Sequence, residues 1–365
     1  MIILGGATMK KILFPGAFYI GSDILNDFVS IARNYGKRFV FIGGRTALSV
    51  SKDAVEASFS GTDCEYSFVV CGKICSEAEV ARVEALPEIN EAEVICALGG
   101  GSCMDIAKLI AFRRNLPLIM IPTTASSDSP CTFASIIYSE DGSRIISDYA
   151  HYRCPDVVMV DSKVIANAPE RLIAAGMGDA MTTWYEGFAC YNNPELKPAI
   201  TETALMLANL CRSIVMKDGL AAYEAVKSNT VTPELEKVIE ANCFLSSIGG
   251  LNTGCACAHG FGDWLCTIPG GHDFMHGERV FIGLITQLIL EKYPDEEIDQ
   301  IMKFGRAIGL PICVGDMRVN DVDALAEKAG IELENDHFLV HLTCDHSPEA
   351  LKGAILKQQV LADNL

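Results

Sequence analysis

Three of the seven histidines lie in one stretch rich in glycine and cysteine, residues 255–280 (CACAHGFGDWLCTIPGGHDFMHGERV). His259 stands in a run of small residues, and His276 opens a second segment after the turn formed by PGG. Neutral imidazole is the commonest side-chain metal ligand. Two histidines from separate helices, joined by a carboxylate from elsewhere, would leave a divalent ion one open position for a substrate oxygen. A lone histidine is more often a core or capping residue, so the rest of the chain has to support a metal site.

A second chemical feature is the stretch ALGGGSCMDIAK, residues 97–108, in which a β-rich run leads into three glycines and then a helical pattern. Gly99, Gly100 and Gly101 allow close backbone approach to a bound group, and Ser102 opens an S-x-x-D helix start. Free amides at such a helix end bind phosphate. The stretch therefore predicts a pyrophosphate site, whereas a simple tight turn would need only one glycine.

The loop IPTTASSDSPCTFASIIY, residues 121–138, follows another apolar run and is rich in hydroxyls. Four side chains are candidates for bonds to ribose, phosphate or carboxamide groups: Thr123, Thr124, Ser126 and Ser127. Asp128 is a candidate contact for a polyhydroxyl substrate. The alternative is a loop that satisfies its own backbone through serine and threonine turns.

Coenzyme choice depends on the turn FVFIGGRTAL, residues 39–48. Folds that bind NAD usually carry an acidic residue near such a strand end, which accepts hydrogen bonds from the ribose 2′-hydroxyl. Gly43 and Gly44 stand there instead, and Arg45 follows. A guanidinium can bind a 2′-phosphate, so the coenzyme is NAD or NADP. Arg45 as a plain solvated charge is the other interpretation.

Composition sets the frame for these motifs. The chain has 365 residues, 50% hydrophobic and 21% charged, with a mean hydropathy of +0.25, which favours two well-filled domains. A net charge of -18 argues against nucleic acid or an anionic membrane as partner. No run is long and apolar enough for a membrane span, and the N-terminal MIILGGATMKKILF reads as a short extension rather than a leader. Fifteen scattered cysteines indicate a reducing cytoplasm rather than a disulfide framework.

Two kinds of pattern divide the chain. Up to residue 166, β-rich runs alternate with helical ones, which predicts a Rossmann-like α/β domain with a parallel sheet over residues 1–166. The predicted strands are Arg38–Ile42, Tyr66–Val70, Val94–Leu98, Leu118–Ile121, Ile136–Tyr138 and Val157–Val160. The strand pattern then stops, and residues 167–365 predict an all-α domain. Its first helix holds Asp179 among small residues, where a carboxylate, if buried, needs a partner or a metal. The alternative is a carboxylate at a helix end that faces solvent.

These motifs together resemble a known family. The runs GGGSCMDIAK, PTTASSDSPCTFASIIY, AAGMGDAMTTWYEG, CACAHG and HGERV have the order and spacing found in the glycerol dehydrogenases, a branch of the metal-dependent, iron-type alcohol dehydrogenases. The resemblance extends from PGAFYIG at Pro15 to SPEALKGAILKQQVLAD near the end. It implies a fold like that of dehydroquinate synthase, an α/β domain followed by a helical domain, with the site in the cleft between them.

The resemblance also implies roles for particular residues. Asp179, His259 and His276 match the three metal ligands, usually for zinc and in some relatives for iron. Asp128 matches the aspartate that contacts the polyol. The positions that match those lining the nicotinamide dinucleotide are Gly99, Gly100, Gly101, Ser102, Thr123, Ser126, Thr132, Ala134 and Tyr138.

Three positions depart from the family pattern. Ser102 stands where glycerol dehydrogenases commonly have lysine, and Gly44 stands where their 2′-hydroxyl aspartate falls. Gly262 replaces a second histidine three residues after the first ligand. These departures concern the coenzyme and the substrate pocket, and they leave the metal ligands untouched.

The expected activity is the metal-dependent transfer of a hydride from the secondary hydroxyl of glycerol, or a related vicinal diol, to NAD or NADP, which gives dihydroxyacetone. The metal is expected to be zinc, with iron as the alternative. The resemblance implies a homo-oligomer, often an octamer. An NADPH-preferring alcohol, aldehyde or hydroxy-acid dehydrogenase of the same family is the first alternative. A dehydroquinate-synthase-like lyase would need a cluster of basic residues, which residues 252–277 lack, and a non-catalytic protein would be expected to lose a ligand.

Overall fold

The computed structural model describes residues 3–4 and 7–365, which form two compact units. The sheet unit contains Leu13–Ile173 and Ala221–Ser247, and the helical unit contains Ala174–Leu220, Ile248–Leu365 and the described residues before Leu13. The predicted division after residue 166 stays a prediction. Of the expected N-terminal extension, residues 1–2 and 5–6 lie outside the described residues, and β1 (Ile3–Leu4) pairs with β2 (Ala7–Thr8).

A six-stranded parallel sheet forms the centre of the sheet unit. In spatial order its strands are β3 (Phe18–Gly21), β10 (Val157–Asp161), β7 (Leu118–Pro122), β6 (Val94–Gly99), β4 (Arg38–Gly43) and β5 (Glu65–Val70). The strands β6, β7 and β10 are buried at every position, as expected where helices cover both faces of a parallel sheet. The strands therefore read as continuous apolar runs, and their carboxyl ends meet at one edge.

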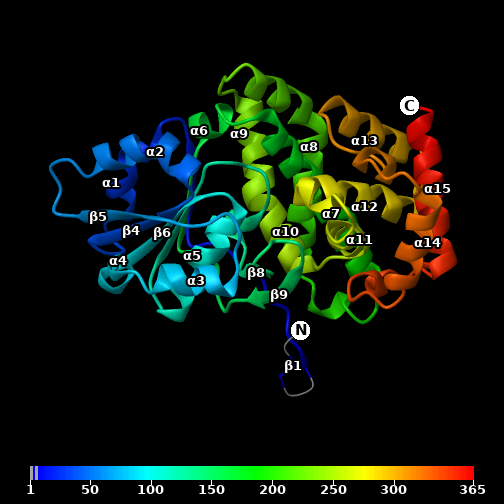
Figure 1. Cartoon of the computed structure of the whole chain (residues 1–365), viewed down its shortest axis with the longest axis horizontal. Helices are drawn as coiled ribbons and strands as arrows, with labels where there is room; N and C mark the ends of the chain where they lie inside the picture. Colours follow the sequence, from blue (N-terminus) through cyan, green and yellow to red (C-terminus); the bar gives the residue numbers. More distant parts are fainter. Residues whose placement is uncertain (1–2, 5–6) are drawn as a thin grey trace. The chain divides into compact units, whose positions relative to one another are not determined.

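Helices and a short ribbon surround this sheet, with α1 and α2 on one side and α3 and α4 on the other (Figure 1). The helices are α1 (Phe28–Ala32), α2 (Arg45–Ser58), α3 (Glu77–Glu84), α4 (Pro87–Glu91), α5 (Gly101–Arg113), α6 (Ser162–Ala166) and α9 (Pro233–Glu240). The ribbon pairs β8 (Ala134–Tyr138) with β9 (Ile145–Ala150) in antiparallel register. The run predicted as a strand at residues 136–138 thus belongs to this ribbon, and β3 and β9 were not predicted.

The helical unit is built from α7 to α15, apart from α9. The bounds are α7 (Glu170–Asn192), α8 (Glu202–Lys227), α10 (Ser246–Thr253), α11 (Cys257–Cys266), α12 (His276–Leu290), α13 (Asp295–Ala307), α14 (Val322–Glu332) and α15 (Pro348–Asp363). A π-helical turn, Ala241–Leu245, links α9 to α10. The core of this unit packs Phe261, Trp264 and Leu265 of α11 against α12, α14 and α15.

The predicted fold class, an α/β domain with a parallel sheet followed by a helical region, is confirmed. All fifteen cysteines are free thiols, and most are buried. Within residues 3–4 and 7–365, no helix combines the length and the apolarity needed to cross a membrane.

Candidate metal centre and dinucleotide pocket

Close backbone packing of α7 against α12 positions two of the candidate ligands. A Cβ placed on Gly277 would overlap the carbonyl oxygen of Ala175, and one placed on Gly178 would lie 2.5 Å from the carbonyl oxygen of Gly277. Only glycines allow the two helices to approach this closely. Asp179 follows Gly178 in α7 and His276 precedes Gly277 in α12, so this contact brings the two side chains together.

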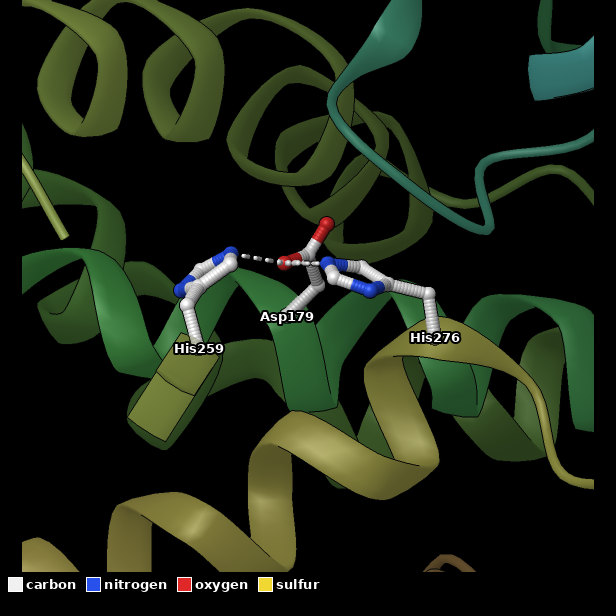
Figure 2. Close-up of side chains that lie close together, drawn as sticks. All are labelled: Asp179, His259 and His276. Carbon is white, nitrogen blue, oxygen red and sulfur yellow. Dashed lines mark ion pairs between the residues drawn. The ribbon is translucent and has the colours of Figure 1, made fainter. Parts of the chain in front are cut away.

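Asp179, His259 and His276 converge from three different helices, α7, α11 and α12 (Figure 2). The Nε2 atoms of His259 and His276 lie 3.8 and 3.6 Å from the same carboxylate oxygen, Oδ1 of Asp179. Asp179 is 3% exposed, whereas the two imidazoles are partly exposed. The structure thus brings together the three residues that the sequence predicts as metal ligands.

The spacing of these donors suits a divalent ion. Distances of 3.6 and 3.8 Å between nitrogen and oxygen are too long for hydrogen bonds. Zinc bonds of about 2.0–2.2 Å in a tetrahedron place neighbouring donors about 3.4 Å apart. Two imidazole nitrogens and one carboxylate oxygen are also a set that zinc and non-haem iron both accept. The residues therefore fit the metal and supply three of the four ligands of a tetrahedral ion.

A second carboxylate, not singled out in the sequence, orients His259. Glu186 is 1% exposed and accepts hydrogen bonds from the amides of Ala256 (2.7 Å) and His259 (2.9 Å) and from Nδ1 of His259 (2.5 Å). Because a carboxylate only accepts, Nδ1 of His259 carries a proton, and Nε2 is the nitrogen that faces Asp179 and can serve a metal once it is deprotonated. The signal was present in the sequence, since Glu186 follows Asp179 by seven residues and so shares its helix face.

The two imidazoles carry opposite pKa shifts. Burial lowers the pKa of His259, but Cys255 and Glu186 outweigh that effect and raise the pKa well above its usual range. The pKa of His276 is held well below its usual range by burial, by repulsion from His259 and by Arg279. Two imidazoles this close cannot both hold an extra proton, so His276 is neutral and its lone pair is available to a metal.

The departure at Gly262 has a steric cause. A Cβ there would lie 2.8 Å from the Cα of Val280, because α11 packs directly on α12 at this point. A histidine at position 262 is therefore excluded by the backbone. One residue further along, Asp263 brings Oδ1 to 3.6 Å from Nδ1 of His276, and burial raises the pKa of Asp263.

The glycine loop lines a pocket of about 920 Å³ in the sheet unit, within the range of small-molecule sites. Five of the predicted coenzyme residues line it: Gly99, Gly100, Gly101, Ser102 and Thr123. The loop starts where β6 ends, and α5 begins at Gly101, as in a strand–loop–helix phosphate site. Thr124 also lines the pocket, and its hydroxyl lies 3.1 Å from that of Ser126.

Two further predicted coenzyme residues, Thr132 and Ala134, contact a buried lysine. Lys108 is fully buried, and its Nζ donates to Asp105 (3.0 Å), to the hydroxyl of Thr132 (2.7 Å) and to the carbonyl of Ala134 (2.7 Å). This network ties the loop before β8 to α5, so Thr132 and Ala134 already have structural partners. Tyr138 ends β8, and its amide donates to the carbonyl of Cys75 at 2.8 Å.

Asp128, the residue predicted to contact the substrate, belongs to the sheet unit, whereas the metal-candidate residues belong to the helical unit. It precedes the short 3-10 turn Ser129–Cys131, and its backbone carbonyl accepts a hydrogen bond from the hydroxyl of Ser247. Its side chain is partly buried.

Known proteins match the chain over nearly its whole length. The family model for iron-containing alcohol dehydrogenase matches residues 15–162. A glycerol dehydrogenase of Escherichia coli O6:H1 is 36% identical over 94% of each chain, and one of Thermotoga maritima is 33% identical over 89% of this chain and 91% of its own. The crystal structure of glycerol dehydrogenase from Schizosaccharomyces pombe superposes with a TM-score of 0.91 at 25% identity, covering 98% of this chain and 92% of that one. The chain belongs to the iron-containing alcohol dehydrogenase family, on the branch that holds the glycerol dehydrogenases.

Proposed function

We propose that the chain oxidises the secondary hydroxyl of glycerol, or of a related vicinal diol, to the ketone, with a nicotinamide dinucleotide as hydride acceptor. The observation that carries the proposal is the cluster of Asp179, His259 and His276, whose donor atoms lie within 4.8 Å of one another. Relatives that are glycerol dehydrogenases support the polyol as substrate. The balanced reaction converts alcohol and oxidised coenzyme into ketone, reduced coenzyme and one proton.

The residues of the chain hold and orient the reactants. A divalent ion, when bound by the three ligands, supplies Lewis acidity that lowers the pKa of a hydroxyl. The nicotinamide, when bound, accepts the hydride. Glu186 keeps the proton of His259 on Nδ1, which leaves Nε2 as a donor atom. The glycine loop is assigned to the pyrophosphate, and Asp128 is assigned to a second hydroxyl of the diol, since an ionised carboxylate accepts hydrogen bonds.

We assign the metal to zinc. Two imidazoles and one carboxylate with a free fourth position are typical of catalytic zinc sites. The donor separations of 3.6 and 3.8 Å match a tetrahedral ion of this size. Metal analysis of the purified protein tests this assignment. Iron at one atom per chain would overturn it, since the same donors also accept iron.

The test of the activity is the appearance of reduced coenzyme, followed by absorbance, after addition of glycerol. Activity should disappear on chelation and return with zinc. His276→Ala should lose both metal and turnover, whereas His272→Ala is the matched control, because His272 is an exposed histidine of the same segment. A His276→Ala protein that keeps its full metal content would remove His276 from the site, and no turnover of any vicinal diol by the zinc-loaded protein would refute the polyol.

We also propose a homo-oligomer that works in a reducing compartment. The fifteen free thiols support the compartment. Apolar side chains exposed on and just after β9 support self-association: Ile146, Tyr149 and Tyr152 are 57%, 54% and 64% exposed. Light scattering of the purified protein gives the mass directly, and a monomer at micromolar concentration would contradict this proposal.

A further inference from the structure

Three neighbouring strands of the sheet unit end at the pocket that contains the glycine loop. In the spatial order β6, β4, β5, the register pairs Gly43 with Leu98 on one side and with Val70 on the other. The amide of Cys71, the residue after β5, donates to the carbonyl of Gly43 at 3.0 Å. The glycine loop after β6, the turn after β4 and the turn after β5 therefore lie side by side, about 4.8 Å between adjacent strands.

Each of the two turns contributes a cation to the pocket lining. Arg45 follows β4 by two residues, and Lys73 follows β5 by three. Both side chains are exposed. Among residues 3–4 and 7–365, the side chains of Arg45 and Lys73 have no ion pair, hydrogen bond or aromatic contact. Both cations are therefore available to an anionic ligand in this pocket.

The other charged side chains of the pocket already have an ion pair or hydrogen bonds. Lys163 pairs with Asp23 at 2.8 Å. The carboxylate of Asp161 accepts from the backbone amides of Lys163 (3.0 Å) and Asp23 (3.1 Å) and so caps a helix. The pocket therefore presents a local positive charge at the ends of β4 and β5, on one side of the glycine loop.

The turn after β4 also lacks the group that would oppose an anion. Gly44 occupies the place where an acidic residue accepts the ribose 2′-hydroxyl in NAD-binding folds. Its φ is -69° and a Cβ there would meet no atom within 4 Å, so a side chain would fit without strain. The backbone therefore does not require glycine at this position. Its effect is to leave open space, with no carboxylate beside the two cations.

We propose that Arg45 and Lys73 form a subsite for the 2′-phosphate of the adenosine ribose, so that the pocket selects NADP over NAD. The inference rests on the proposed function, because it places the pyrophosphate of the coenzyme on the neighbouring glycine loop. A 2′-phosphate carries close to two negative charges and offers oxygens that accept from a guanidinium and an ammonium. Occupation of the subsite would pair both cations.

Binding of the coenzyme to the metal-depleted protein tests the subsite without any turnover. Isothermal titration calorimetry compares NADP with NAD, and adenosine 2′,5′-bisphosphate with adenosine 5′-monophosphate. We expect the 2′-phosphorylated member of each pair to bind at least about tenfold more tightly, because its phosphate accepts charge-assisted hydrogen bonds from both cations. Its affinity should also fall more steeply with added salt.

Single substitutions distinguish the contribution of the two cations to coenzyme affinity from that of the rest of the pocket. Arg45→Gln and Lys73→Gln should each weaken NADP by about tenfold and leave NAD unchanged. Lys163→Gln is the matched control, since that lysine lines the same pocket but is paired; it should weaken both coenzymes equally or neither. Gly44→Asp should reverse the preference, because the carboxylate repels the phosphate and accepts from a 2′-hydroxyl.

The outcomes distinguish this inference from the proposed function. Binding of NAD with an affinity equal to or greater than that of NADP in the unchanged protein would overturn the subsite and leave the dehydrogenase intact. Loss of NAD and NADP affinity together in Lys73→Gln would also overturn it, because the lysine would then serve the shared part of the coenzyme. Failure of both dinucleotides to bind would instead refute the proposed function.

Discussion

Replacing Glu186 by glutamine tests how the protein prepares His259 as a ligand. Glutamine has nearly the same shape, and its single carbonyl oxygen can keep the hydrogen bonds from the amides of Ala256 and His259. Its amino group then faces Nδ1 of His259, where the carboxylate now accepts. A donor facing Nδ1 favours the tautomer with the proton on Nε2, the nitrogen that lies 3.8 Å from Asp179.

The size of the effect follows from these contacts. The fold should survive, because Glu186→Gln keeps two of the three hydrogen bonds and the buried volume. The metal has to displace the Nε2 proton and accept a misoriented ring, and loss of such an orienting partner typically weakens metal binding by about 10–100-fold. This is about 1.4–2.7 kcal/mol, since a factor of ten corresponds to about 1.36 kcal/mol.

Two measurements check this prediction. Competition with a chromogenic chelator gives the zinc dissociation constant, and ¹⁵N spectra of the metal-free protein, recorded at a pH high enough for the ring of His259 to be neutral, give its tautomer. Glu291→Gln is a suitable control, because the carboxylate of Glu291 accepts from Gln287 at 2.9 Å rather than from an imidazole. An unchanged dissociation constant in Glu186→Gln, with the proton still on Nδ1, would refute the orienting role of this residue.

Two further substitutions test packing and pH dependence. Gly277→Ala places a methyl group on the carbonyl of Ala175 and must push α12 away from α7; we expect a loss of about 1–3 kcal/mol of unfolding free energy together with weaker zinc binding, and normal values of both by denaturation and chelator competition would contradict the close contact. Burial raises the pKa of Glu291 from 4.5 to about 7, opposed by Gln287 and assisted by Glu186. The pKa of Glu291 is higher in the folded than in the unfolded protein. The stability that goes with a protonated Glu291 is therefore fully present below about pH 4.5 and is lost as the pH rises through about 7. Glu291→Gln should therefore be more stable than the unchanged protein at pH 8, by up to about 3 kcal/mol, and no more stable at pH 4.5; an equal difference at the two pH values in denaturant titrations would rule out this carboxylate as the cause.

Local sequence patterns determine the strands, the helices and the chemical types of the site. Buried parallel strands read as apolar runs of five or six residues, so β4, β6, β7 and β10 were located within one or two residues. The edge strand β3 and the exposed strand β9 have no such run and were missed. Asp179, His259 and His276 were recognised because metal binding demands particular side chains, which the family resemblance then assigned.

Only the tertiary structure decided how these side chains are held and which charges are paired. The hydrogen bond that His259 donates to Glu186 depends on α7 lying against α11, and the contact of Gly277 with Ala175 depends on the close approach of two backbones. Likewise, Lys73 lies many residues from Arg45 and enters the same pocket only because β5 is the neighbour of β4. Sequence periodicity reports which face of an element is buried. It does not report which distant residues that face contacts, and the chemistry of this site depends on those long-range contacts.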